Sequence, residues 1–227
     1  MTTLNGKGIN QANTLQRSSL KIPDWIFPTC AVIVVITALV WVTPIAVAYI
    51  SGEPIPSKVR NNSDRPLWFV VHVVTGSYAL LLGALQMHQP LRNSHRNLHR
   101  LFGRVYVGLV IVSALTSLSL DPRLTIYGTE ILRPLAAALW LGTTALGVIA
   151  IRRREISSHR RWMIRSYALA YMGITFLILS GLGKNIGLPI EVRYPLVIWL
   201  SLLLNVAIAE IYIFRTAHKS PDIASTI

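Results

Sequence analysis

Charged residues are scarce in this sequence: they make up 14% of its 227 residues, against about 25% in a typical soluble domain. Acidic residues are the scarcest of these, with nine Asp and Glu against 22 Lys and Arg, so the net charge is +13. This shortage of charge argues against a soluble globular enzyme. The single cysteine, Cys30, excludes an intrachain disulfide and a zinc site built on a Cys-x-x-Cys pair.

Several catalytic motifs are missing as well. The sequence has no Walker loop, no HExxH, no GxSxG and no DxxxD pair for a prenyl diphosphate and Mg²⁺. Phosphoryl transfer and serine hydrolysis by those routes therefore have no residues to support them.

Hydrophobic residues are abundant, at 52% of the chain. They gather in six runs, near residues 25–50, 67–87, 103–120, 134–151, 163–183 and 194–214. Each run is about long enough to cross a ~30 Å hydrocarbon core as a helix. The sequence therefore predicts an all-α, polytopic membrane bundle of six transmembrane helices, in which spans 2–5 form a four-helix core.

The predicted domain organisation is simple. It consists of a polar tail over 1–24, a six-span domain over 25–215 with a kink at Pro44, and a second tail over 216–227. The acid-poor N-terminal residues are read as a disordered tail, with a transit peptide as the alternative.

Basic residues are distributed unevenly between the two predicted membrane faces. Six spans place both termini on one side, and 15 of the 22 Lys and Arg fall on that side. The positive-inside rule makes that side cytoplasmic, where anionic lipid is the predicted partner. Nucleic-acid binding is the weakest interpretation, because the arginines sort by membrane side and no nucleic-acid partner is expected. The sequence leaves open whether the membrane is a plasma membrane or an organelle membrane.

Histidines at membrane depth are the main candidates for chemistry, because ionisable groups there are costly. In the second span, His72 shares a stripe about 80° wide with Gly76, Gly83 and Gln86. A small and polar stripe of this kind faces other helices. His72 is interpreted as a second-site ligand or a quinone or substrate contact, and alternatively as a packed, hydrogen-bonded histidine.

The third and fifth spans open alike. The third begins with His99 and Arg100 and continues to Arg104 and Tyr106; the fifth repeats the pattern from His159 with one extra residue. The similarity suggests two related helical hairpins, spans 2–3 and 4–5, with chance convergence of two basic loops as the alternative. His99 and His159 fall at the same depth, so they are candidates for the two axial ligands of a haem iron.

Other polar residues complete the predicted site. Arg100, Arg104 and Arg165 could pair with haem propionates, because guanidinium groups match carboxylates. The alternative is that the basic and histidine residues only anchor helix ends at the lipid headgroups. The remaining bundle-facing polar residues are Gln86, Tyr106, Tyr167 and Glu210. Glu210 is expected to pair with Arg215 or with an arginine of the nearby loops.

Over residues 30–215 the chain resembles a family of multi-pass membrane proteins, domain of unknown function 2306. The resemblance depends on His72 with Gly76, Gly83 with Gln86, Trp140, the stretch from His99 to Tyr106, and the stretch from His159 to Tyr167. It implies the architecture and no particular reaction. An arginine that often follows in the fifth span of the family is replaced here by Leu177. The histidine pattern is also similar, more loosely, to the haem-binding core of transmembrane b-type cytochromes.

Three functions remain open from the sequence. The first is a membrane redox protein with a b-type haem. The second is a haem-free membrane enzyme in which His72, His99 and His159 bind a metal or act on a lipophilic substrate. The third is a non-catalytic transporter, sensor or scaffold.

Overall fold

The computed structural model describes residues 66–88, 92–93, 95–118 and 131–217, together with Ile36, Thr43, Val47, Ala48 and Ser51. Pro44 and the continuous course of the predicted first span lie outside the described residues, as do the N-terminal tail and residues 218–227.

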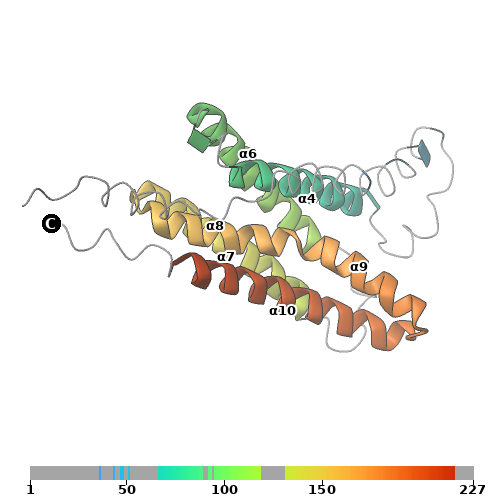
Figure 1. Cartoon of the computed structure of the whole chain (residues 1–227). Coiled ribbons are helices and arrows are strands. Elements are labelled where there is room, and N and C mark those ends of the chain that lie inside the picture. Colours follow the sequence, from blue (N-terminus) through green and yellow to red (C-terminus); the bar gives the residue numbers. More distant parts are fainter. Residues whose placement is uncertain are drawn as a thin grey trace, which may run out of the picture.

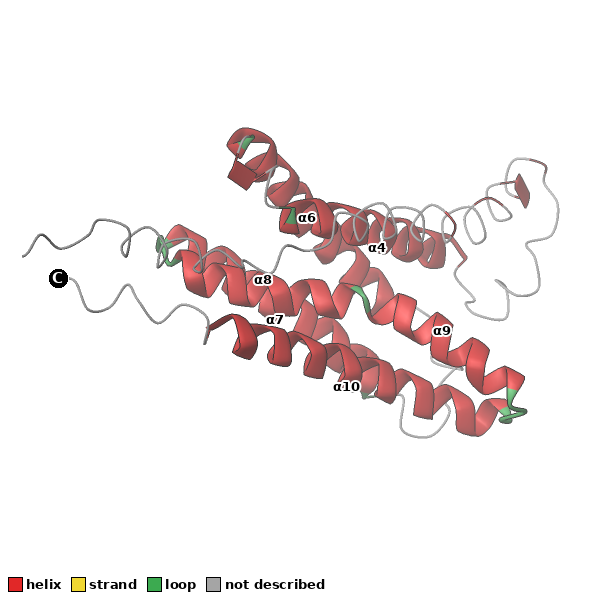
Figure 2. Ribbon diagram, viewed as in Figure 1, coloured by secondary structure: helices red, strands yellow, loops and turns green. Residues whose placement is uncertain are grey.

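The described part of the chain is helical throughout (Figure 2). The helices are α4 (Pro66–Met87), α6 (Arg96–Leu118), α7 (Leu132–Arg152), α8 (Ile156–Ala170), α9 (Met172–Asn185) and α10 (Ile190–Ala217). Counting α8 and α9 as one helix from Ile156 to Asn185, five helices are long and apolar enough to cross a membrane. The all-α class and the membrane-spanning helices are confirmed for these residues, whereas the sixth span and the separate four-helix core remain predictions.

Two helices begin well before their apolar runs. α6 starts at Arg96, where the sequence predicted residue 103, and α8 starts at Ile156, where it predicted residue 163. Arginine has a good helix propensity, and its long side chain can extend away from the apolar region. Hydropathy therefore marks the part of each helix in the hydrocarbon, and the basic first turns lie outside that part.

The fifth span is divided between α8 and α9 at Tyr171. The backbone of Tyr171 stays in the right-handed helical region, with φ −72° and ψ −12°. The amide of Ile174 donates to the Tyr171 carbonyl three residues back, at 3.1 Å. A single tightened turn thus joins the two helices without a loop.

Two helix pairs pack most extensively: α4 with α6, and α7 with α8. α6 also packs on α7, α4 on α8, and α10 lies along both α8 and α9 (Figure 1). The buried core contains residues from all of these spans, among them Ala79, Tyr106, Trp140, Leu169 and Leu202. We call α4–α6 the first pair and α7–α8 the second pair.

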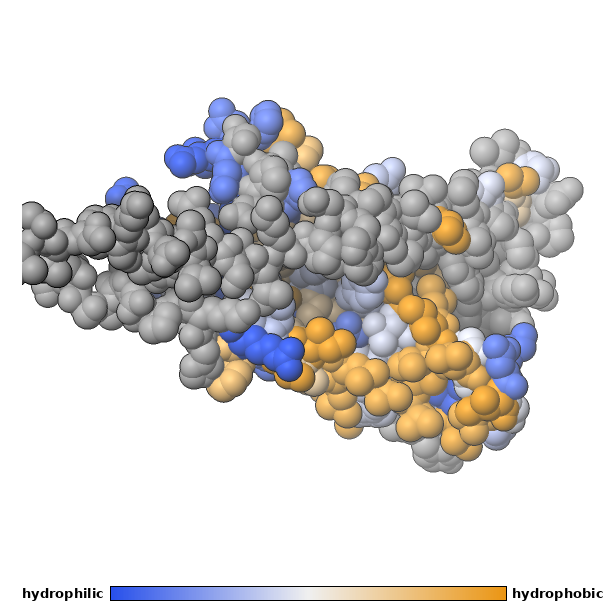
Figure 3. All heavy atoms as spheres, viewed as in Figure 1, coloured by the Kyte–Doolittle hydropathy of each residue, from blue (hydrophilic) through white to orange (hydrophobic). Residues whose placement is uncertain are grey.

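Large apolar side chains also cover the outside of the bundle. Figure 3 shows them over α9 and α10, and they include Ile178, Leu182, Leu203, Ile208 and Phe214. Hydrophilic residues gather instead at the end where α6 begins. An apolar exterior of this kind suits a lipid solvent. We call the end that holds the start of α6, the α7–α8 turn and the end of α10 the basic end.

Candidate functional site

A chain of buried hydroxyl groups joins three helices in the centre of the bundle. Tyr106 Oη of α6 lies 2.8 Å from Ser166 Oγ of α8, which lies 2.7 Å from Thr144 Oγ1 of α7. Thr144 donates its one proton to the Trp140 carbonyl at 2.7 Å. Ser166 must therefore donate to Thr144, and Tyr106 must donate to Ser166. All three hydroxyl residues are buried, so the chain fixes the two helix pairs against each other.

This contact also sets the register of α6 against α8. Tyr106 follows His99 by seven residues, and Ser166 follows His159 by seven residues. Seven residues are about two helical turns, which return a side chain to nearly the same face. Because α6 and α8 are alternate spans that run in the same direction, the Tyr106–Ser166 bond brings His99 and His159 to the same depth, about 10.5 Å nearer the basic end.

The structure agrees with this register. His99 lies within electrostatic range of the His159 ring and of Arg92. Its Nδ1 atom is buried and has no hydrogen-bond partner among the described residues. A buried polar atom without a partner is costly. The two histidines thus lie within electrostatic range of each other, and one of them presents an unsatisfied ring nitrogen.

His159 is held in place by the neighbouring helix. Its Nδ1 lies 2.8 Å from the Gly147 carbonyl of α7, so Nδ1–H is the donor and Nε2 keeps its lone pair. A Cβ on Gly147 would stand 2.7 Å from Met163 Sδ. The lack of a side chain at Gly147 therefore permits the close helix approach that orients His159.

Two further contacts fix α4 beside this site. Gln86 Nε2 donates to the His99 carbonyl at 3.0 Å. A Cβ on Gly83 would overlap the Tyr167 ring, at 2.3 Å from Cδ2, and would stand 3.2 Å from Tyr106 Cε2. Gln86, Tyr106 and Tyr167 thus all face the bundle interior.

His72 lies elsewhere in the first pair. Its Nδ1 lies 2.8 Å from the Ser113 carbonyl of α6, and Ser113 Oγ donates to the His72 carbonyl at 3.2 Å. Ser113 is 14 residues from His99, about 21 Å along α6. Within the described ranges no three His, Cys, Asp or Glu side chains gather closely enough to hold a metal ion. The structure therefore separates His72 from the His99–His159 pair.

Glu210 of α10 pairs with Arg165, the last arginine of the basic segment 152–165, and not with Arg215, so the expected pairing with a nearby loop arginine is the one found. The guanidinium makes two contacts, Nε to Oε1 at 2.6 Å and Nη2 to Oε2 at 2.9 Å. It also lies over the Trp162 ring, 4.7 Å from the centroid. Glu210 is on the outer surface of the bundle, with a side chain that is 48% exposed. This ion pair occupies the Nε–Nη2 edge of the Arg165 guanidinium, and it joins α10 to α8.

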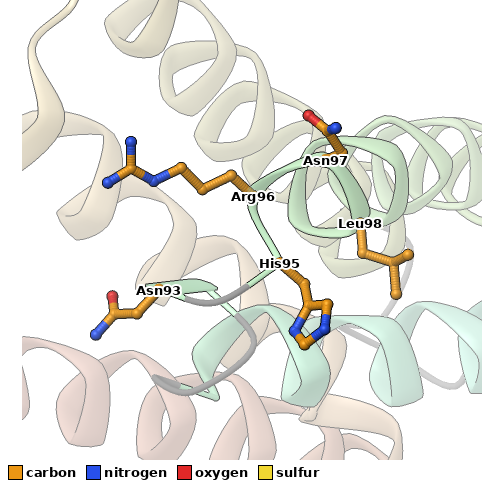
Figure 4. A pocket seen from close by; sticks show the side chains of 5 residues that line it. All are labelled: Asn93, His95, Arg96, Asn97 and Leu98. Atoms are coloured by element: carbon orange, nitrogen blue, oxygen red, sulfur yellow. The ribbon is translucent and has the colours of Figure 1, made fainter.

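Arg100 and Arg104 are exposed at the basic end, on the first turns of α6. A hollow of about 490 Å³ lies beside them, lined by Asn93, His95, Arg96, Asn97 and Leu98. Figure 4 shows that these side chains diverge from the chain and do not converge on one point. The hollow therefore has no set of groups directed at a common ligand.

A comparison with known protein families identifies the family of this chain. A family model described as a predicted membrane protein, DUF2306, matches residues 69–213. The chain belongs to this family. The match covers all five described spans and both histidines of the pair, and it makes the protein an integral, multi-pass membrane protein. No match to the chain is found among curated proteins or among solved structures.

Two residues of this DUF2306 member escaped the sequence reasoning. Thr144 completes the hydroxyl chain, and Gly147 orients His159. Both lie on one face of α7 with Trp140, at positions 140, 144 and 147. The helical wheel that located the polar faces of the other spans would have found this face too, but the fourth span has no ionisable residue at depth to draw attention to it.

Proposed function

We propose that this protein is a membrane redox protein that holds one b-type haem between His99 and His159 near the basic end. The observation that supports the proposal is the equal seven-residue offset from the Tyr106–Ser166 bond, from which helix geometry gives the two imidazoles the same depth on α6 and α8. Axial ligation needs two imidazoles held from opposite sides by rigid helices.

The number of histidines and their hydrogen bonding fit a haem. A haem iron takes four nitrogens from the porphyrin and needs two from the protein, whereas a zinc site usually takes three or four protein ligands. His159 is held through Nδ1 by a backbone carbonyl, which is the usual arrangement for a metal-ligating histidine. The unpartnered Nδ1 of His99 is a polar atom that a bound group could satisfy. When bound, haem supplies one-electron transfer.

The arginines near the histidine pair differ in whether they already have a carboxylate partner. Arg165 is engaged by Glu210, so the proposal assigns the haem carboxylates to the exposed Arg100 and Arg104. Their planar guanidinium groups can each donate two hydrogen bonds to a carboxylate. His72 of α4 bonds Ser113, about 21 Å along α6 from His99, and takes no part in this site.

The test is a spectrum of the purified protein, recorded reduced minus oxidised, with the haem content measured per chain. We expect about one haem in the wild-type protein and loss of it in His99→Ala and in His159→Ala. His72→Ala and His95→Ala serve as matched histidine controls and should retain it. The absence of a Soret band after expression with ample haem would overturn the proposal, as would unchanged haem content in both ligand variants.

A further inference from the structure

The turn between α7 and α8 at the basic end carries three consecutive arginines, Arg152, Arg153 and Arg154, and it is the green turn at the left of Figure 2. The turn is a Schellman motif: the Glu155 amide donates to the Ala150 carbonyl and the Arg154 amide to the Ile151 carbonyl, both at 3.0 Å. All three arginine side chains are exposed.

Arg154 occupies an unfavourable backbone conformation. Its φ is +63°, and among the described residues it is the one non-glycine residue with a positive φ. This position of the motif is normally glycine, because a Cβ there crowds the backbone. Glycine would therefore fold more easily here, so the arginine is retained at a cost to the turn. A residue held in a strained conformation points to a function for its side chain.

The surroundings of Arg154 are positive and unneutralised. Arg160 and Arg161 follow one to two turns into α8 and are also exposed. In the described structure no carboxylate pairs with these five guanidinium groups, and Glu155 is the one acidic residue between Arg152 and Arg161. Ile151 and Ile156, 41% and 64% exposed, flank the turn. The patch thus combines unpaired guanidinium groups with apolar side chains at the end of two membrane helices.

We propose that the patch formed by Arg152, Arg153, Arg154, Arg160 and Arg161 binds the phosphate headgroups of anionic phospholipids. Guanidinium groups bind phosphate oxygens in pairs. The exposed Ile151 and Ile156 offer apolar contacts to the acyl chains of a lipid, which a soluble phosphate lacks. This inference is tested separately from the haem proposal, because the variants that test it change Arg152, Arg153 and Arg154, five to seven residues before His159, and leave both histidines in place.

The test compares lipid preference with stability in single variants of the full chain. The protein is purified in detergent with equal phosphatidylglycerol and phosphatidylcholine, and the bound lipids are counted by native mass spectrometry. Each arginine near an anionic surface contributes about 1 kcal/mol, which is about fivefold in affinity. Arg154→Gly should therefore lower the phosphatidylglycerol preference about fivefold, and Arg154→Lys should retain it.

Stability should move in the opposite direction. Arg154→Gly relieves the positive φ, so its melting midpoint should rise, by about 2–4 °C for each 1 kcal/mol gained. Lys184→Gln at the opposite end of the bundle is the matched control and should change neither quantity. The proposal is overturned if the Arg152→Gln, Arg153→Gln, Arg154→Gln triple variant keeps the lipid preference, if Lys184→Gln loses as much, or if inorganic phosphate displaces the lipid at equal concentration.

Discussion

The two helix pairs each hold one histidine by the same kind of bond. In the first pair, His72 of α4 donates from Nδ1 to the Ser113 carbonyl, and in the second pair His159 of α8 donates from Nδ1 to the Gly147 carbonyl. Both bonds measure 2.8 Å, and both leave Nε2 as the basic nitrogen. The difference lies in what comes near the ring. His159 has His99 within electrostatic range, whereas in the described part of the first pair His88 and His99 lie about 24 Å and 21 Å away from the level of His72 along α4 and α6.

This comparison shows that orientation of the imidazole does not distinguish the two pairs. A backbone carbonyl fixes the ring in both, but a second histidine lies within electrostatic range of the ring in the second pair. What brings that histidine near is the contact between the pairs, where Tyr106 meets Ser166 and Gly83 meets Tyr167. The predictions below therefore separate contacts between the pairs from contacts within a pair.

The largest effect is expected at the contact between the pairs, in Gly83→Ala. The added Cβ would lie 2.3 Å from the Tyr167 ring, so the ring or a helix must move. Overpacking of this kind costs about 1–3 kcal/mol. The free energy of unfolding in mixed micelles should fall by that amount. Gly108→Ala, whose Cβ would meet nothing within 4 Å, is the control. A Gly83→Ala protein as stable as this control would mean that the pairs are not tightly joined.

The Tyr106–Ser166 bond should give the next largest effect. Tyr106→Phe removes the hydroxyl that links α6 to α8, and the net loss should be about 1 kcal/mol. Ser201→Ala is the control, because Ser201 is equally buried but donates to Val197 within its own helix. The same unfolding measurement should find little change there. If the two variants lose equal stability, the Tyr106–Ser166 bond contributes no more to the free energy of unfolding than a bond within one helix.

Tyr106→Phe should also affect the proposed haem site. Since the hydroxyl sets the register of His99 against His159, its loss should shift the midpoint potential or the spin state of bound haem. Ser166→Thr keeps both hydroxyls of the bond and should retain the wild-type spectrum.

The sequence predicted the histidine pair but not the contacts that create it. His99 and His159 could be matched because an ionisable residue at the start of an apolar run is conspicuous, and because both runs open with the same residues. The tertiary partners could not be read in the same way. Thr144 and Gly147 are ordinary residues of an apolar span, and their importance depends on which carbonyl or hydroxyl of another helix lies opposite.

The helix ends show the same limit. Hydropathy located all five described spans, yet α6 and α8 begin seven residues earlier than their apolar runs. The sequence left open which nearby arginine pairs with Glu210, because the choice of Arg165 depends on helix packing. Sequence patterns report the environment of a residue, whereas partner choice is a property of the assembled bundle.

Within the pairs, two glycines allow a matched test. A Cβ on Gly147 would stand 2.7 Å from Met163 Sδ in the second pair, and a Cβ on Gly76 would stand 3.2 Å from Ser113 Oγ in the first. Gly147→Ala should cost about 1 kcal/mol, at the low end for overpacking because methionine is flexible. Gly76→Ala should cost less. Chemical denaturation of the two variants in the same detergent decides the order, and a larger loss in Gly76→Ala would contradict it.

The smallest effect is expected for the contact that joins α10 to the second pair. Arg165 and Glu210 form a two-point ion pair, but both side chains are partly exposed, at 27% and 48%. Exposed pairs contribute about 0.2–1 kcal/mol, because solvent screens the charges and two long side chains must be ordered. A double-mutant cycle with Glu210→Gln and Arg165→Gln should give a coupling energy in that range, reduced at high salt. A coupling energy well above it, unchanged by salt, would mean that lipid shields this pair, and that α10 is fixed to α8 as firmly as the two helix pairs are fixed to each other.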